Sequence, residues 1–188
     1  MARQPRQGEV AWSQTEKINA ELFAFTYGSL VVKLIKELES LSKVNSTLDE
    51  MGYNIGMRLI DDFLSKNEVN CDKLSDTAEI IAKVGFKAYL GITCEVANWS
   101  EETKEYPKEF SLIVSENPMT EYVELREDYR ELSYCNLICG VIRGCLHMLK
   151  FESRVFVLKD SLKGDDVTEI RVVVTSRKDD EYEPDDDA

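Results

Sequence analysis

The sequence lacks most of the features that mark nucleic-acid-binding and membrane-spanning proteins. It contains 23 Lys and Arg residues against 36 Asp and Glu residues, so its formal net charge is −13. Because binding to a phosphate backbone requires a basic surface, we expect no nucleic-acid partner. The longest apolar stretches are interrupted by Lys, Arg or Glu before they could span a bilayer. Any membrane contact should therefore come through a partner, a surface or an added lipid.

Signatures of the common enzyme classes are also missing. The chain has no Gly-x-Ser-x-Gly nucleophile turn, no phosphate-binding loop and no dinucleotide-binding glycine motif. Its one histidine, His147, follows Cys135, Cys139 and Cys145 on a predicted helix, where Cys145 points to a different side from the other two cysteines. Zinc requires about four convergent ligands, so we expect no metal site.

Neither end of the sequence shows a targeting signal. Residues 1–9 are polar, without an apolar stretch of the secretory type, and Ala2 stands where N-myristoylation requires glycine. Five cysteines occur without an export signal. We therefore expect free thiols in a reducing, cytoplasmic environment.

The 188 residues, 43% of them hydrophobic, are enough for one domain with a full core. We expect a flexible start over residues 1–11, a compact domain over 12–178 and an acidic, flexible tail over 179–188. The acidic residues of the tail are Asp179, Asp180, Glu181, Glu183, Asp185, Asp186 and Asp187. Much of the net negative charge is therefore local, and the body is only mildly acidic.

The first half of the chain predicts helices. Ser13 and Glu16 have the spacing of a capping box, and apolar residues then recur at helical spacing over 18–38. A second apolar stripe runs over 48–63, and a third over 74–91, where Gly91 is a helix-ending residue. We expect three helices here.

The second half mixes strands with one helix. Short apolar runs at Phe110–Val114, Tyr122–Leu125, Arg154–Lys159 and Glu169–Thr175 predict strands, and Tyr134–Leu149 restores a helical period. Strands that flank a single late helix favour an α+β fold, with helices packed on a twisted antiparallel sheet.

Two pairs of glycines occur four residues apart on the predicted helices: Gly52 with Gly56, and Gly140 with Gly144. Glycine lowers helix propensity but allows another element to approach closely. Packing between helices of the same domain is the simpler interpretation. A close partner or an enclosed ligand is the alternative.

The most informative segment is the amphipathic helix predicted over Met51–Leu64, followed seven residues later by Cys71 in a short polar loop. This arrangement suits a hydrophobic body with one modifiable thiol beside it, without a polar catalytic cluster. A nucleophilic thiol would need a basic neighbour to lower its pKa. Lys66 and Lys73 are the nearby candidates.

Five segments in this order resemble the subunit 3 family of the transport protein particle (TRAPP), a vesicle-tethering complex: Glu21–Leu30, Met51–Leu64, Ile80–Ile92, Tyr134–Leu146 and Leu162–Arg171. The resemblance implies helices on a twisted antiparallel sheet and a scaffold that is not an enzyme. It also implies pairing through helices with related small subunits, or with a second copy when isolated. The assembled complex would exchange nucleotide on a Rab GTPase, peripherally at the cis-Golgi and endoplasmic reticulum.

The resemblance further implies a fatty acyl thioester, palmitate, on Cys71, with its chain in an apolar tunnel inside the domain. Each buried methylene would contribute about 0.8 kcal/mol. Gly85 and Ala88, small residues on the third predicted helix, are where the core would leave room. Asn70 stands where the family pattern suggests a basic residue, and Gly85 where it suggests alanine, which would widen the tunnel.

The resemblance also implies that the C-terminal segment approaches the bound GTPase, here through Glu181 or Glu183, whose carboxylates would compete with nucleotide phosphates. A solubilising tail is the alternative. Two other functions stay open from the residues alone: a dimeric sensor of an apolar ligand, and a cysteine-dependent acyl-transfer enzyme.

Overall fold

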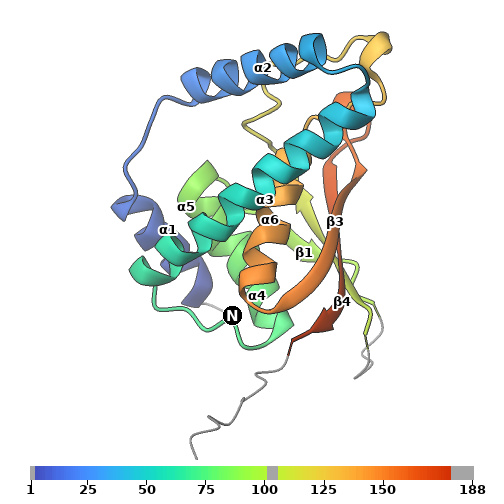
Figure 1. Ribbon diagram of the computed structural model, residues 1–188. Helices are drawn as coiled ribbons and strands as arrows, with labels where there is room; N and C mark the ends of the chain where they lie inside the picture. Colours follow the sequence, from blue (N-terminus) through green and yellow to red (C-terminus); the bar gives the residue numbers. More distant parts are fainter. Residues whose placement is uncertain (1–2, 101–105, 179–188) are drawn as a thin grey trace, which may run out of the picture.

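The computed structural model describes residues 3–100 and 106–178 as one α+β domain (Figure 1). The helices gather on one side of a four-stranded antiparallel sheet, which confirms the predicted fold class. The helical segments are α1 (Arg3–Gln14), α2 (Ala20–Glu37), α3 (Leu41–Lys66), α4 (Leu74–Ile80), the π-helical η1 (Ile81–Gly85), α5 (Phe86–Leu90), the 3₁₀ turns η2 (Glu127–Tyr129) and η3 (Ser161–Lys163), and α6 (Asn136–Met148). The strands are β1 (Glu95–Ala97), β2 (Lys108–Val114), β3 (Phe151–Lys159) and β4 (Thr168–Arg177).

The sheet has the order β1-β2-β4-β3, with β4 between its two long neighbours. Val172 on β4 lies opposite Phe110 on β2 and Val155 on β3, and all three are buried. Since side chains alternate along a strand, this row of β4, which includes Ile170 and Val174, faces the helices. The main core lies between this face of the sheet and α6.

The backbones of α3 and α6 approach each other closely at their glycines. A Cβ built at Gly52 would lie 2.1 Å from the carbonyl oxygen of Leu137, and one at Gly140 would lie 2.1 Å from that of Asp49. Gly56 faces Val141 in the same way, so both helices run in the same direction. The glycine pairs therefore serve packing within the domain, the simpler of the two interpretations.

The start of the chain differs from the expectation. Most of residues 1–11, predicted to be flexible, belong to α1, and Ala11 is buried. Gly8 lets α1 approach the carbonyl oxygen of Lys83 in η1, to which a Cβ would come within 2.3 Å. A short helix without a strong apolar stripe is thus held by contacts with distant residues, which local sequence does not show.

The predicted capping box is also wrong. Ser13 lies inside α1, where its hydroxyl donates to the carbonyl oxygen of Val10 at 2.8 Å. The long helix α2 begins instead after Asn19, whose side chain accepts from the amide of Leu22 at 2.9 Å. The helical stripe that follows, over 18–38, is confirmed in its main part.

The remaining elements agree closely with the sequence, with two exceptions. The stripes over 48–63 and 74–91 lie in α3 and in the α4-η1-α5 segment, which ends at Gly91 with a positive φ of 73°. Residues 122–125 form no strand, whereas the unpredicted β1 pairs Val96 with Leu112 of β2. The expected tail over 179–188 lies outside the described residues.

Candidate functional site

An almost entirely apolar cavity of about 280 Å³ lies between α3, α6 and the α4-η1-α5 segment. Its walls contain Ile55, Leu59, Ile60 and Phe63 of α3; Thr77, Ile80, Ile81, Gly85, Phe86, Tyr89 and Leu90 of the α4-η1-α5 segment; and Leu137, Ile138, Val141, Ile142, Cys145 and Leu149 of the α6 region. Phe23, Cys71 and Met119 complete it. Such a space suits an apolar ligand.

The cavity lining extends along α3 and α6. Because the two helices run in the same direction, Leu137 lies toward one end of the lining, and Phe63 and Leu149 lie toward the other. The twelve residue steps from Leu137 to Leu149 correspond to a rise of about 18 Å along a helix. Cys71 packs with Phe63 in the second apolar cluster, whereas Phe23 packs in the main one. Figure 1 shows α2 and α4 at opposite ends of the molecule.

The wall formed by η1 explains part of the free space. A Cβ built at Gly85 would find no atom nearer than the carbonyl oxygen of Ile80, at 3.8 Å. Gly85 therefore leaves unfilled the volume that a side chain would occupy. A π-helical turn inside an α-helix often accompanies a functional site, and here it carries the glycine that lines the cavity.

Ala88, expected as a tunnel residue, is not among the residues that line this cavity. The cavity face of this helix passes through Gly85, Phe86 and Tyr89, and at about 100° per residue Ala88 lies on its flank. It is 3% exposed and packs instead in a second cluster with Ala11 of α1. The structure thus brings Gly85 to the same cavity as Cys71, but not Ala88.

Cys71 is half-buried in the segment that joins α3 to α4. The Thr77 hydroxyl donates to its carbonyl oxygen at 3.0 Å, and Arg177 donates to the carbonyl oxygen of Asp72 at 2.5 Å. The side chain of Asn70 accepts from the amide of Asp72 at 2.8 Å. The thiol is therefore presented to the cavity by a segment that α4 and the end of β4 hold in place.

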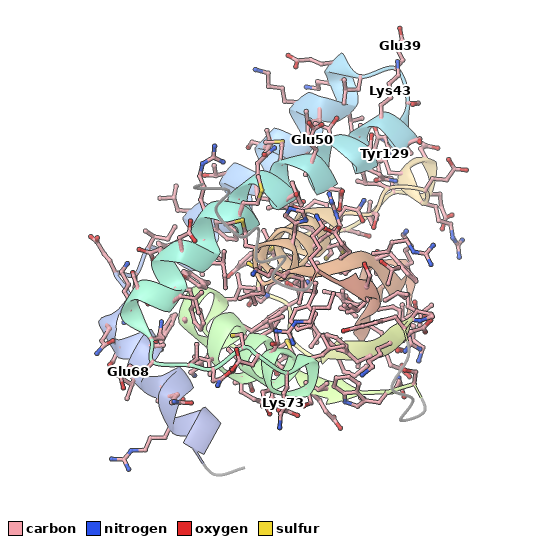
Figure 2. All side chains as sticks on the ribbon, turned by 60° about the horizontal axis from the view of Figure 1, so that its bottom comes forward. Glu39, Lys43, Glu50, Glu68, Lys73 and Tyr129 are labelled. Carbon is pink, nitrogen blue, oxygen red and sulfur yellow. The ribbon has the colours of Figure 1, made fainter. Side chains whose placement is uncertain are left out.

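The electrostatics around Cys71 do not favour a self-activated nucleophile. Burial raises the pKa of its thiol above the ordinary value, the carboxylates of Asp72 and Asp76 raise it further, and a hydrogen bond from Thr77 opposes them. Lys66, one candidate basic partner, pairs instead with Asp62 at 2.6 Å. In Figure 2, Glu68 and Lys73 lie toward the two ends of the segment that carries Cys71.

Sequence reasoning does not single out Phe23, Met119 or Cys145 as cavity residues. Phe23 precedes the buried Tyr27 by one helical repeat of four residues, a signal that could have been used. Met119, buried in the turn after Pro118, carries no such signal. The Cys145 thiol donates to the carbonyl oxygen of Gly56 at 3.4 Å, and burial raises its pKa to about 12, so it is a poor nucleophile.

The other candidates from the sequence lie elsewhere. The Nδ1 atom of His147 lies 3.2 Å from a carboxylate oxygen of Glu152, and its ring contacts Tyr53. Across residues 3–100 and 106–178, no three His, Cys, Asp or Glu residues are grouped as metal ligands would be. Glu181 and Glu183 lie outside the described residues. In the same two ranges, no helix is both long and apolar enough to cross a membrane.

A sequence profile of the family described as transport protein particle (TRAPP) component matches residues 23–173. The chain is 44% identical over 169 residues to trafficking protein particle complex subunit 3 of Dictyostelium discoideum, covering 89% of each chain. It is 46% identical over 167 residues to transport protein particle subunit bet3 of Schizosaccharomyces pombe, covering 88% of each. The chain belongs to the TRAPP subunit 3 family. The resemblance carried by the five sequence segments is confirmed, and the chain is a subunit type that associates with other TRAPP subunits in vesicle transport.

A solved structure of a TRAPP subunit 3 superimposes on this chain with a TM-score of 0.80 at 46% identity, covering 87% of this chain and 99% of the other. It is described as trafficking protein particle complex subunit 3 from Naegleria fowleri, covalently bound to palmitic acid. A fatty acyl ligand is thus documented for a close relative with the same fold. The family match begins at residue 23, so α1 lies outside the matched part of the chain.

Proposed function

We propose that this TRAPP subunit 3 chain is a scaffold whose Cys71 carries a fatty acyl thioester, with the acyl chain inside the domain. The observation that carries the proposal is that Cys71 lines an apolar cavity. The thiolate would attack the carbonyl carbon of an acyl thioester donor, forming a new thioester, while the donor thiol leaves and takes up a proton. Palmitate is the chain expected, given the relative that is covalently bound to palmitic acid.

Burial of the chain would stabilise the fold without anchoring it to a bilayer. Each buried methylene contributes about 0.8 kcal/mol, so a long chain strengthens a core that is otherwise incompletely filled. A chain held inside the domain is not free to insert into a membrane. Contact with membranes would then come only through the assembled complex.

Intact mass spectrometry of protein purified from its own cell tests the thioester. We expect an added fatty-acyl mass that neutral hydroxylamine removes and that Cys71→Ser lacks. Cys145→Ser is the matched control, because Cys145 lines the same cavity but lies on α6, and it should retain the added mass. An unmodified wild-type mass would contradict the proposal. Turnover of an acyl thioester that depends on Cys71 would instead favour the acyl-transfer enzyme.

The partner surface in this proposal is the outer apolar face, formed by Leu22, Phe25 and Val32 of α2 together with Tyr122. These side chains are 63%, 59%, 50% and 46% exposed. The rings of Phe25 and Tyr122 lie with centroids 5.7 Å apart, so the face is continuous. Because the relatives are subunits of a particle, the occupant that we propose is a related small TRAPP subunit, with a second copy of the chain taking its place in isolation.

Introduction of a charge into this apolar surface provides the test. Leu22→Glu should abolish co-purification with the neighbouring small subunits and leave the isolated chain monomeric in sedimentation. Leu158→Glu, at a similarly exposed apolar residue on β3, is the control and should retain both interactions. Loss of both interactions in the control alone would place the interface on the sheet.

In the assembled complex, the subunit would support nucleotide exchange on a Rab GTPase in traffic between endoplasmic reticulum and Golgi, on the cytoplasmic side of the cis-Golgi and endoplasmic reticulum. Glu181 or Glu183 would approach the GTPase and compete with nucleotide phosphates. Deletion of residues 179–188 should then slow exchange by the reconstituted complex without affecting its assembly. Unchanged exchange would leave the tail with a solubilising role.

A further inference from the structure

The first turn of α2 meets the domain through Phe23, which packs against the main core and also lines the cavity. Residues 16–22 are all exposed, and Phe23 is the first residue of α2 that is not. Phe23 lines the same cavity as Cys71, but it packs in the main core cluster, whereas Cys71 packs in the second cluster. If the cavity is empty, the side of Phe23 that lines it lacks dispersion contacts, and the helical turn is held by fewer contacts.

The rest of α2 is attached more firmly. Ala24, Tyr27 and Val31 are buried on one face of the helix, and the Tyr27 hydroxyl donates to the carbonyl oxygen of Tyr134 at 2.5 Å. The rings of Tyr27 and Tyr134 also meet edge to face, with centroids 5.0 Å apart. The fixed part of the helix thus begins immediately beyond the turn that depends on the cavity.

The cavity lining meets the outer apolar face through two separate segments. On α2, Phe23 lines the cavity while Leu22 and Phe25 point outward. In the turn region after β2, Met119 is buried against the cavity while Tyr122 is exposed and contacts Phe25. Each segment therefore has a side chain that lines the cavity and, within three residues of it, a side chain on the outer apolar face.

We propose that the acyl chain supports the partner surface from inside the domain. A chain that reaches Phe23 and Met119 fixes the first turn of α2 and the Met119–Tyr122 turn, and so fixes the arrangement of the outer apolar face. This inference rests on the proposed acylation of Cys71. A ligand alters a distant surface only if it favours one arrangement of the segment between them. Here that segment is a single helical turn with its own inner aromatic side chain.

Hydrogen exchange of the backbone amides tests this coupling directly. The acylated protein and the same preparation after hydroxylamine are compared by mass spectrometry of peptides from residues 20–37. We expect exchange in the first turns of α2 to become roughly tenfold faster after deacylation, as local opening becomes easier. Peptides from α6 provide the internal reference for a general loss of stability.

Phe23→Ala and Phe25→Ala form a matched pair, because they remove the same side chain two residues apart on opposite sides of the helix. In Phe23→Ala, the acylated and deacylated fractions should show no difference in exchange over the first turns of α2. Phe25→Ala should retain that difference and weaken binding of the neighbouring subunit. Equal exchange of α2 in acylated and deacylated wild-type protein would overturn the inference, while the acyl mass itself would still support the proposed function.

If the purified protein carries no acyl group, free palmitic acid serves as the probe. Saturation with palmitic acid should slow exchange in the first turns of α2 in wild type and have no effect there in Phe23→Ala. No change in wild type would overturn the coupling. That outcome is distinct from failure of the covalent modification, which the intact mass reports separately.

Discussion

The α3–α6 contact and the cavity beside it both depend on helical glycines, but these glycines have opposite surroundings. At Gly52 and Gly140 a Cβ would meet a backbone oxygen at 2.1 Å, whereas at Gly85 the nearest atom would be 3.8 Å away. The first pair lets two backbones touch, and Gly85 leaves a volume unfilled. The effect of a glycine on a helix therefore depends on the element that faces it, which decides whether the missing side chain allows close contact or leaves free space.

The two regions also differ in mechanical character. Along the α3–α6 contact, Arg143 pairs with Asp49 at 2.6 Å and lies over the Tyr53 ring, 4.3 Å from its centroid. Around the cavity, apolar side chains have no protein atoms in contact on the side that lines it. A well-packed contact resists displacement, while the lining of a void lacks partner atoms on one side. The domain therefore combines a rigid α3–α6 contact, called the seam below, with a cavity lining that can adjust.

The largest expected effect comes from adding a methyl group to the rigid seam. Gly52→Ala would force its Cβ against the carbonyl group of Leu137, so α3 and α6 must move apart. We expect a loss of about 3 kcal/mol in the free energy of unfolding, at the upper end of overpacking effects. Urea unfolding measures it, with Gly28→Ala as the control, because a Cβ there would meet only Tyr134 Oη at 3.5 Å. A loss in Gly52→Ala no larger than in the control would show that the seam is adjustable.

The second-largest effect is expected when a side chain at position 85 fills the cavity. Gly85→Leu should fold, because the added side chain enters free space, but it should lose the acyl mass since the leucine occupies the path of the chain. Gly85→Ala should retain an acyl group and gain up to about 1 kcal/mol in the unacylated protein from helix propensity alone. Intact mass and thermal unfolding of both variants provide the readouts. A full acyl mass on Gly85→Leu would mean that the chain runs elsewhere.

A smaller effect is expected from Arg143→Lys on the seam. Lysine retains the positive charge but loses the planar group that lies over Tyr53 and binds Asp49. We expect a loss of about 1 kcal/mol in the free energy of unfolding, since the pair is partly exposed. Chemical denaturation of Arg143→Lys and Arg143→Met separates the two contributions. Equal losses in both variants would assign the effect to shape and stacking rather than to charge.

The smallest effect concerns the pH dependence of the reactivity of the Cys71 thiol. Because burial, Asp72 and Asp76 raise the pKa of the Cys71 thiol, less thiolate is present at pH 8 than in a free cysteine. Alkylation of Cys71 in deacylated protein should therefore be slow, with its rate rising at higher pH than for a model thiol. Asp72→Asn should move the pH profile toward lower pH and speed alkylation a few-fold at pH 8. A profile unchanged by this substitution would leave burial and Asp76 as the causes of the raised pKa.

Much of the fold could be predicted because apolar periodicity is a local signal. The stripes of α2, α3 and α6 are long enough to identify a helix whatever surrounds it, and β2, β3 and β4 have strongly apolar runs. β1 has only three residues, too few for a pattern. The Tyr122–Leu125 run predicts a strand, but Tyr122 points outward against Phe25, and none of the described strands pairs with this run.

The site could be predicted only in outline. Cys71 stands out through its position after a marked helix and through the family pattern, yet a void leaves no trace in a sequence. Whether Gly85 or Ala88 faces that void depends on the rotation of the helix about its axis, which contacts with α1 and α6 set. Ala11, which packs on the far side of the same helix, belongs to a segment that looked flexible for want of a long apolar stripe.

The unfilled cavity has a further consequence for how the chain responds to compression. Unfolding eliminates internal voids, so the unfolded state of a protein with an apolar cavity of about 280 Å³ has the smaller volume. Hydrostatic pressure should therefore unfold the empty form well before the form whose cavity is filled by a lipid chain. In this respect the lipid would act as an incompressible part of the interior, and the two forms would share one fold with different molar volumes.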